Sequence, residues 1–401
     1  MRIYLIGNGL DLRYGLATKY ENFLHTLSFL LEHRNTAFQS VGQVFRDEEL
    51  LKQDPTIKAS YEKYGDAYNK VLLDPQKVSE IINKAQNNMW FSYLRNTMFT
   101  GKRWIDFEKE IAQVLELLEY GLANTQNNGN EIALSPHIAN NQAITYILHC
   151  FNYFWVNATS NTEIGIYSYY AIKDEYLIES PAGSGRHEIN QNAIAQRLFD
   201  SLIDLADCLK LYLQCFVENA VYQFAKQGII QTDCRLIQED ESKPFVVSLN
   251  YTHTWETLYP NATVCHVHGE TNKQIVLGIN SNKHDTLAAL NTVFIQFKKY
   301  YQRVVFFSDV DYLCNIRDLK AIYSRSLIIL HVIGHSLDVT DKDIIQELFG
   351  IAHRIYIFYH NETSLQNYIA NLISIYGKEE FDRLRFEKNL SFVKTDLLNK
   401  E

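Results

Sequence analysis

The chain begins with a short apolar run that stops at a glycine turn. Residues 3–6 are apolar, the turn Gly7-Asn8-Gly9 follows, and leucines then recur at a spacing that suits a helix. This order of strand, glycine turn and helix is typical of the first unit of a nucleotide-binding α/β fold. Glycines allow a tight turn and let a phosphate approach without meeting a Cβ atom. Because the turn departs from the GxGxxG fingerprint, an ordinary tight turn after a strand is an equal alternative.

A mainly helical pattern runs from residue 19 to about residue 228. Apolar stripes at helical spacing span residues 20–31 and 198–224, and Gly228 ends the second stripe. Polar and glycine-rich stretches at residues 124–130 and 179–186 predict loops. The dense aromatic residues between 146 and 176 lack interleaved Lys and Arg, so we expect them in the core rather than in a stacking platform for single-stranded nucleic acid.

The segment WIDFE precedes an amphipathic helix within this region. Asp106 is placed to accept hydrogen bonds from the first N–H groups of that helix. We therefore favour capping by Asp106 over a catalytic carboxylate pair with Glu108. The sequence assigns no role to Trp104.

The second half of the chain returns to strand-like segments. Strands are expected at residues 244–249, 263–269, 274–279, 326–333, 354–359 and 391–395, a helix is expected at 286–301, and residues 304–307 fit either. The run at 326–333 is apolar throughout, as a parallel strand buried on both faces requires. Strands that end in small or polar residues before helices predict a parallel sheet with ligands at the carboxyl ends.

The predicted fold class is therefore α/β, with a Rossmann-type parallel sheet and a large helical insertion after the first strand. One domain is expected from residues 1–18 and 244–401, because the first strand has no nearby partners in the sequence. Residues 19–243 would form the mostly helical insertion. A loop rich in Gly, Ser and Pro at residues 181–185 is a candidate lid over the pocket.

Composition narrows the class of protein. The chain of 401 residues is 46% hydrophobic and 21% charged, which is typical of a globular protein with a large core. It contains no apolar run near the roughly 20 residues of a membrane helix. Six cysteines without a CxxC pair suggest buried thiols in a reducing cytoplasm. A net charge of −9 argues against a nucleic-acid partner.

Four strand ends with polar or small residues are expected to converge. They are Gly7-Asn8-Gly9, Asn250-Tyr251-Thr252, His268-Gly269 and Gly334-His335-Ser336. The segments IGNGLDLRYGLATKYENFL, WIDFE, LNYTHTWE, HVHG and VIGHSLDVTD, in this order, resemble the AbiH family of bacteriophage abortive-infection proteins. That family is in turn similar to the sirtuin-like NAD-binding fold.

The resemblance implies which residues would bind and cleave NAD. His268 resembles the catalytic histidine of sirtuins, and Asn250 resembles the asparagine that contacts the ribose on the nicotinamide side. The resemblance implies NAD-binding residues in the glycine turn and after a later strand: Gly7, Asn8, Gly9, Asp11, Gly334 and Ser336. Asn8 stands in place of an alanine, and Asp11 stands roughly in place of a serine. The zinc-binding cysteine pairs of sirtuins are absent, which argues against protein deacylation.

The activity implied is cleavage of NAD at the nicotinamide–ribose bond in defence against phage. A histidine can deprotonate a ribose hydroxyl or an attacking water, and an asparagine can orient the ribose. No metal is expected. A phage-derived trigger or partner protein and a homo-oligomer are the expected partners, and no membrane is expected to take part.

Two other functions stay open at this stage. The protein could be a sensor that binds NAD or ADP-ribose without turning it over. Alternatively, His266 and His268 are expected on the same face of one strand, since every second residue points the same way. They could be the first two metal ligands of a metal-dependent hydrolase, with Asp11, Asp106 or Asp338 as further ligands. We expect the remaining candidates to be structural: His331 and His335 to pack or face solvent, and Cys265 to be a buried small side chain.

Overall fold

The computed structural model describes residues 1–99, 106–128, 131–151, 154–162, 165–180, 187–232, 243–280, 293–322 and 327–395. These residues form two compact units. The first comprises Met1–Ile82, Asp207–Val276 and Arg303–Glu401, and the second comprises Asn83–Ala206 and Leu277–Gln302. These units group residues that pack together. The domain boundaries expected after residues 18 and 243 divide the chain by its sequence instead, so they stay a prediction.

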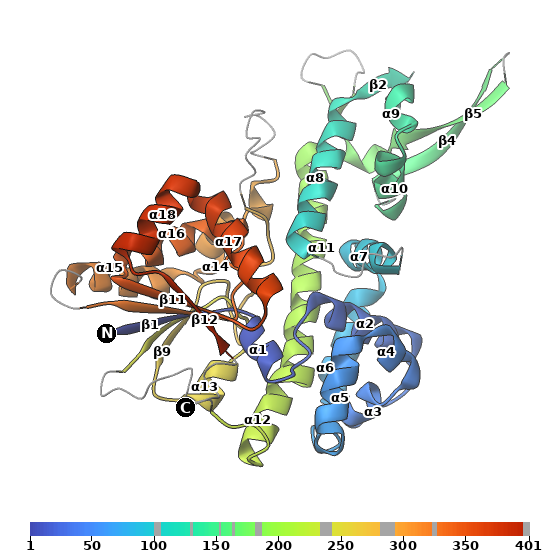
Figure 1. Cartoon of the computed structure of the whole chain (residues 1–401). Coiled ribbons are helices and arrows are strands. Elements are labelled where there is room, and N and C mark those ends of the chain that lie inside the picture. The colour runs from blue at the N-terminus through green and yellow to red at the C-terminus, as the bar shows by residue number, and fades with distance from the viewer. Residues whose placement is uncertain are drawn as a thin grey trace. The chain divides into compact units, whose positions relative to one another are not determined.

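A six-stranded parallel sheet forms the centre of the first unit (Figure 1). Its strands, in spatial order, are β12 (Ser391–Lys394), β11 (Arg354–Tyr359), β10 (Ile329–Ile333), β1 (Arg2–Ile6), β8 (Phe245–Ser248) and β9 (Thr263–His266). The first strand thus pairs on both sides with strands from the second half of the chain. The α/β class and the parallel sheet expected from the sequence are confirmed.

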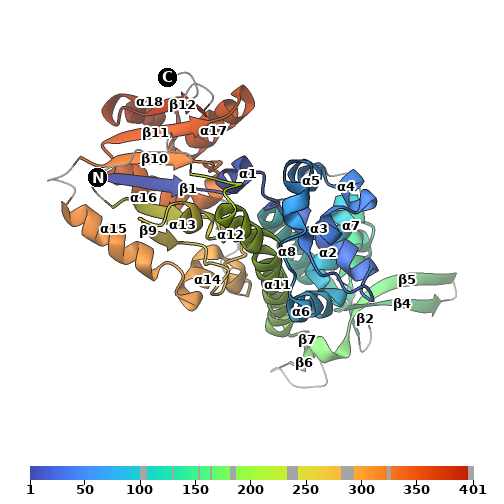
Figure 2. The same ribbon diagram turned by 90° about the horizontal axis from the view of Figure 1, so that it is seen from below.

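The register of the sheet brings four strand ends to one edge. Ile6 pairs with Ile333 of β10 and with Ser248 of β8, and Ser248 pairs with His266 of β9. The segments that follow β1, β8, β9 and β10 therefore leave the sheet side by side, and the order of the strands can be followed in Figure 2. This edge is the carboxyl edge of the sheet.

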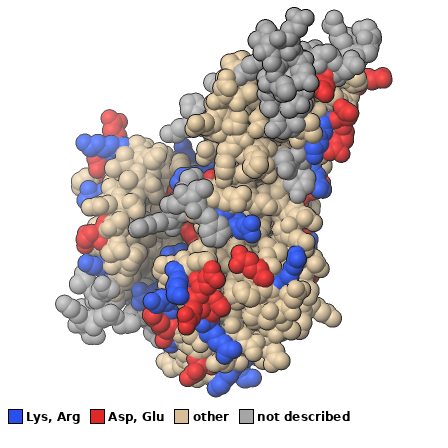
Figure 3. Space-filling view, turned by 90° about the vertical axis from the view of Figure 1, so that its right-hand side faces the viewer, with Lys and Arg blue, Asp and Glu red and all other residues tan. Residues whose placement is uncertain are grey.

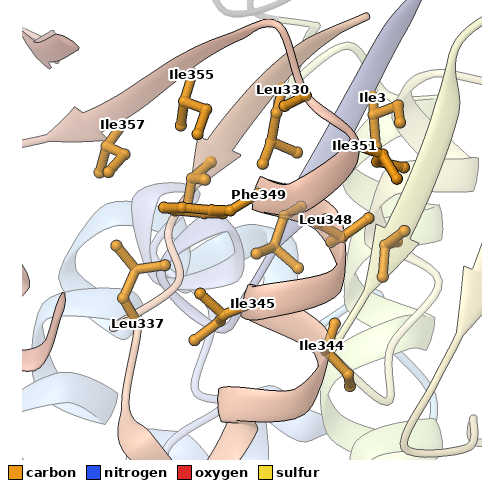
Figure 4. Packing of buried hydrophobic residues seen from close by; sticks show 14 of the residues in the cluster. Ile3, Leu330, Leu337, Ile344, Ile345, Leu348, Phe349, Ile351, Ile355 and Ile357 are labelled. Atoms are coloured by element: carbon orange, nitrogen blue, oxygen red, sulfur yellow. The ribbon is translucent and has the colours of Figure 1, made fainter. Parts of the chain in front are cut away.

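Apolar residues on both faces of the strands hold the sheet against its helices. On one face, α16 (Lys342–Ile351) packs Ile345, Leu348 and Phe349 against the strands, as Figure 4 shows. On the other face, Tyr4 contacts Trp255 of α13 (Thr254–Leu258), with ring centroids 5.2 Å apart. Burial on both faces explains why these strands are apolar runs without alternation.

Helices make up most of the remaining structure. They are α1 (Gly9–Arg13), α2 (Tyr20–Glu32), α3 (Val41–Phe45), α4 (Glu48–Gln53), α5 (Pro55–Tyr68), α6 (Pro75–Gln86), α7 (Met89–Phe99), α8 (Phe107–Ala123), α9 (Pro136–Ala139), α10 (Gln142–Cys150), α11 (Gln191–Tyr212), α12 (Asn219–Lys226), α14 (Lys299–Phe306), α15 (Val310–Ile322), α17 (Glu362–Tyr376) and α18 (Lys378–Glu387). A π-helical segment, Leu213–Glu218, joins α11 to α12. No described helix is both long enough and apolar enough to cross a membrane.

The second unit contains strands that the sequence analysis missed. Its antiparallel sheet has the order β2 (Thr125–Asn128), β3 (Glu131–Leu134), β5 (Gly165–Ile172) and β4 (Trp155–Thr162). The expected loop at 124–130 is therefore partly a strand, and the aromatic stretch contributes a hairpin. A further pair, β6 (Leu177–Glu179) with β7 (His187–Ile189), flanks residues 181–186, so the candidate lid lies outside the described residues.

Other local expectations are corrected near the carboxyl edge. Residues 274–279 are not a strand of the sheet; they are held by isolated bridges and by a bond from Val276 N to His268 O (2.7 Å). Residues 304–307, left open between strand and helix, belong to the end of α14 and the turn after it. The strand expected at 263–269 ends at His266, so His268 lies in the turn that follows.

Candidate functional site

Two strand-end loops touch backbone to backbone at the middle of the carboxyl edge. Gly9 N donates to Gly334 O (2.7 Å), and Gly7 N donates to Ile333 O (3.1 Å). A Cβ atom on Gly9 would lie 2.6 Å from Gly334 Cα, and a Cβ atom on Gly334 would lie 2.3 Å from Leu10 N. Gly334 also has a φ of 66°, in the left-handed region. The close contact between the two loops therefore requires glycine at positions 9 and 334 whether or not a ligand binds there.

Asn8 and Ser336 flank this contact on the exposed side. The Asn8 amide donates to Thr18 O (3.2 Å), and the Thr18 hydroxyl donates back to Asn8 Oδ1. The Ser336 side chain is exposed, and its carbonyl oxygen accepts a bond from Asn371 Nδ2 (3.0 Å). Both positions are accessible to a ligand that approaches from solvent.

Asp11 lies buried on α1, just behind the glycine turn. Its Oδ2 accepts a hydrogen bond from the Thr252 hydroxyl (2.7 Å), and Asn250 Nδ2 lies 3.5 Å away. Its Oδ1 accepts no hydrogen bond from the described residues. Burial raises the pKa of Asp11 to about 6, against hydrogen bonds from Thr252 and Thr254 that lower it. Asp11 is therefore a buried acidic side chain with polar neighbours, and one of its oxygens accepts no hydrogen bond from the described residues.

A shared carboxylate joins His268 and His335. Asp341 Oδ1 lies 2.8 Å from His268 Nε2, and Asp341 Oδ2 lies 3.2 Å from His335 Nε2. Leu337 N donates to His335 Nδ1 (3.0 Å), so His335 carries its proton on Nε2 and donates it to Asp341. All three side chains are buried. In the tautomer that carries its proton on Nε2, His268 would likewise donate to Asp341.

A second group of polar side chains connects the loop after β8 with the end of β9. The two rings of this group, His253 and His266, lie 5.1 Å apart between their centroids. His253 contacts Glu218 through Nδ1 (2.7 Å) and Glu270 through Nε2 (2.6 Å). His266 contacts Glu256 through Nε2 (2.7 Å). Hydrogen bonding to Glu218, and then to Glu270, raises the pKa of His253 to about 9 against the effect of burial.

One contact connects the second group to Asn250. His266 Nδ1 lies 2.8 Å from the carbonyl oxygen of Asn250, to which it donates. The position of Asn250 is therefore linked both to Asp11 and to the His253–His266 group. Among the described residues, the group close enough to hold one metal ion is His253, His266 and Glu270, and it does not contain His268.

The carboxylates considered for a site around His266 and His268 lie elsewhere or have other roles. Asp106 caps α8 by accepting from Glu108 N (3.1 Å) and Lys109 N (3.3 Å), so the expected capping role is confirmed. Asp338 accepts from Thr340 N (3.0 Å) and caps a 3₁₀ turn.

Several other candidates have structural surroundings. Glu108 forms an ion pair with Lys299 (2.6 Å), both within the second unit, while Trp104 lies outside the described residues. Cys265 is buried, as expected. His331 packs among rings, as expected, with ring centroids 5.0 Å from Tyr4 and 5.9 Å from Phe358.

The sequence analysis missed the partners that complete both groups. It assigned no role to Thr252, Asp341, His253 or the three glutamates, and it expected His335 only to pack or face solvent. A signal was present in HTWE and HVHGE, where histidine and glutamate alternate directly after two strands. In VIGHSLDVTD, His335 is followed six residues later by Asp341 after the end of a predicted strand.

The fold and this edge define an α/β protein with a polar site at the carboxyl ends of parallel strands. The sequence model of the family described as "Bacteriophage abortive infection AbiH" matches residues 3–359. The chain belongs to the AbiH family. Comparisons with curated proteins and with solved structures found no match.

Proposed function

We propose that this protein acts in abortive infection by cleaving NAD at the nicotinamide–ribose bond. The observation that carries the proposal is the buried His268–Asp341 pair at the carboxyl edge (2.8 Å), together with Asn250 and Asp11 on the neighbouring strand ends. Asn250 and His268 each lie two residues beyond the paired positions Ser248 and His266. The membership of the AbiH family supports the phage-defence role.

The location of the site supports a nucleotide as the ligand. In open parallel sheets, ligands bind outside the carboxyl ends of the strands, where the chain reverses its order in the sheet. Here β1 lies between β10 and β8, so its glycine turn sits at such a position. The resemblance to the sirtuin-like fold supports NAD as this nucleotide. In this proposal, the exposed side chains of Asn8 and Ser336 would contact its phosphates and ribose.

The chemistry proposed uses three side chains. As the bond from C1′ to the nicotinamide nitrogen breaks, positive charge develops on the ribose, and the buried Asp11 carboxylate stabilises it. Asn250 orients the ribose or the attacking water. A water molecule forms the new bond to C1′ and gives its proton to His268 Nδ1. Nicotinamide leaves as a neutral molecule, and ADP-ribose is the other product.

Asp341 has a supporting role in this scheme. Because it accepts the Nε2 proton of His268, it holds the ring in the tautomer whose Nδ1 can take a proton. It also stabilises the imidazolium that forms when His268 accepts that proton. His335 donates to the second oxygen of Asp341 and so fixes the orientation of the carboxylate.

Nicotinamide release from NAD by the purified protein tests the proposal. Wild type should release nicotinamide, and His268→Ala and Asn250→Ala should each release it about 10²- to 10⁴-fold more slowly, while remaining folded by circular dichroism. Asp338→Asn, in the same loop as Asp341, is the matched control and should retain the rate. Undiminished release by His268→Ala would contradict the assignment, and NAD binding without release by wild type would assign a sensor instead.

The family role requires that the activity is restrained before infection, since free NAD cleavage would harm the host cell. We propose that a phage-derived product, a partner protein or assembly into a homo-oligomer provides the trigger. On the face drawn in Figure 3, acidic and basic side chains are intermingled, which fits the prediction that nucleic acid is not a partner. The net charge of −9 supports the same prediction.

A further inference from the structure

The group around His253 and His266 contains more carboxylate oxygens than its two imidazole rings can satisfy by hydrogen bonding. Three carboxylates, from Glu218, Glu256 and Glu270, contact two imidazole rings. One of the carboxylate oxygens, Glu256 Oε2, is buried and accepts no hydrogen bond from the described residues. The group therefore contains one more carboxylate than imidazole ring, and the ammonium group of Lys273 pairs with Glu270.

Each ring is oriented in the way that is usual for a metal ligand. Histidines that bind metals almost always donate the N–H of the other ring nitrogen to a carboxylate or a backbone carbonyl. His253 Nδ1 contacts Glu218 Oε1 (2.7 Å), and His266 Nδ1 contacts the carbonyl oxygen of Asn250 (2.8 Å). Both Nε2 atoms are thereby turned toward carboxylates, Glu270 for His253 and Glu256 for His266.

Two of the carboxylates in this group, Glu218 and Glu270, are themselves held in place by further contacts. Glu218 Oε1 also accepts bonds from His253 N (2.9 Å) and from the Thr271 hydroxyl (2.7 Å). Glu270 Oε1 pairs with Lys273 (2.7 Å), which leaves Oε2 directed toward His253. Orientation by such partners is what keeps ligands in position before an ion binds.

We propose that His253 Nε2, His266 Nε2 and a carboxylate oxygen of Glu270 bind a divalent transition-metal ion, for which zinc is the simplest choice. One ring nitrogen of each histidine and one oxygen of Glu270 all lie within 4.8 Å of one another. Two imidazoles and one carboxylate form a common protein ligand set for zinc, with bonds of about 2.0–2.2 Å. Tetrahedral bonds of that length hold ligand atoms about 3.3 Å apart, so small side-chain rotations suffice.

The ion would be a positioning element for the neighbouring site. Its ligands come from the loop after β8, the last residue of β9 and the turn after it, and it would bind these three segments together. His266 holds the Asn250 carbonyl, and His253 follows Thr252, the partner of Asp11. Glu256, paired with His266 at 2.7 Å, is the carboxylate available for a fourth position. The site differs from one built on His266 and His268, because His268 is bonded to Asp341.

Zinc binding by chelator-treated protein tests this inference without any measurement of NAD cleavage. After dialysis against zinc chloride, elemental analysis should find about one zinc ion per chain that survives gel filtration. Cobalt(II) in its place should give the intense visible absorption of a four-coordinate ion. His266→Gln and Glu270→Gln should each weaken zinc binding at least about tenfold. Two variants from different segments guard against a local folding defect in either.

His25→Gln is the matched control, because His25 also contacts a carboxylate, Asp54, at 3.0 Å, but without a second histidine in a group that could hold an ion. The His25 variant should bind zinc as wild type does. Added zinc should raise the melting temperatures of wild type and of this variant equally. The inference is overturned if wild type retains neither zinc nor cobalt. It is also overturned if the His266, Glu270 and His25 variants all retain the metal equally, which would indicate adventitious binding at the surface.

Discussion

The interior of the sheet and its carboxyl edge differ in what surrounds a buried histidine, as His331 and His335 show. His331, inside β10, lies among the rings of Tyr4, Tyr356 and Phe358, and neither of its ring nitrogens has a hydrogen-bond partner among the described residues. His335, just beyond the strand, uses both ring nitrogens, one for Leu337 N and one for Asp341. Both side chains are buried, so burial alone does not separate them.

The difference shows that packing determines the interior, whereas polar contacts between strand ends determine the edge. In the interior, burial lowers the pKa of His331 to about 4, with a further contribution from the charge of Arg2, so the ring stays neutral and acts as an aromatic side chain. At the edge, bonds such as those of Asp341 to His268 and His335 connect different strand ends. Substitutions of the polar side chains at the edge should therefore alter the proposed activity, whereas a substitution in the interior that preserves the packing should leave it unchanged.

Asp341→Asn should give the largest effect. An amide can donate as well as accept, so it no longer fixes the tautomer of His268 or stabilises its protonated ring. If His268 acts as proposed, we expect nicotinamide release to fall about 10²- to 10⁴-fold, the range known for carboxylates that orient the catalytic histidine of a triad. Asp338→Asn should not change the rate. A loss that leaves the pH profile unchanged would indicate that Asp341 acts only through the fold.

Gly334→Ala should give the next largest effect, and on stability. The new methyl group would meet Leu10 N at 2.3 Å, and the residue would keep a φ of 66°. We expect a loss of about 2–5 kcal/mol in the free energy of unfolding from the clash and the strained backbone. Gly350→Ala in α16 is the control, since its Cβ atom would meet nothing within 4 Å. Equal stabilities of the two variants in urea unfolding would show that the two loops are not in contact.

Asp11→Asn tests the buried carboxylate at the edge. Burial raises the pKa of Asp11 from 3.8 to about 6, so the folded state binds a proton that the unfolded state has lost between these pH values. Its contribution to stability is therefore fully present below a pH of about 4 and is lost as the pH rises to about 6. At 1.36 kcal/mol per pKa unit, the variant should gain up to about 3 kcal/mol relative to wild type across that window.

Urea unfolding of both proteins at several pH values measures this difference. The same variant should lose most of its nicotinamide release, because the amide carries no charge to stabilise the ribose cation. A stability difference that does not vary with pH would show that Asp11 is already ionised in the folded protein at the lower pH.

His331→Phe should give the smallest effect. The ring would remain among its aromatic neighbours, so we expect no change in nicotinamide release and a change in stability within about 1 kcal/mol at neutral pH. The lowered pKa of His331 means that wild type loses stability as the pH falls from about 6.5 to about 4, because the unfolded chain takes up the proton first. The variant should lack this loss. A drop in nicotinamide release by the variant would indicate that His331 belongs to the site, and the proposed difference between His331 and His335 would then be wrong.

The interior of the sheet could be predicted from the sequence more fully than its edge. The apolar run that contains β10 is recognisable because strands buried on both faces need apolar residues throughout, and the glycine turn after β1 marked the end of that strand. The run at 274–279 looked equally strand-like, but its backbone bonds to the turn after β9 instead of to the sheet. Local pattern does not reveal which partner a strand-like segment finds.

The candidate site could be located from the sequence, but its connections could not. The strand ends at Asn250 and His268 identified the edge, since parallel strands share the side on which they end. The bond from His268 to Asp341 spans 73 positions, and the bond from Thr252 to Asp11 spans 241. Such pairs depend on the three-dimensional register of strands and loops, which a single sequence does not specify. The glycines were expected to admit a phosphate, whereas their close contact with each other also requires them.

The NAD content of infected cells tests the central claim most directly. Cells that carry the wild-type gene, the His268→Ala gene or the Asp338→Asn gene would be infected with phage and sampled for NAD and for released phage. We expect NAD to fall before phage release with the wild-type and Asp338→Asn genes, and to stay level, without protection, with the His268→Ala gene. Protection by the wild-type gene while NAD stays level would contradict the account.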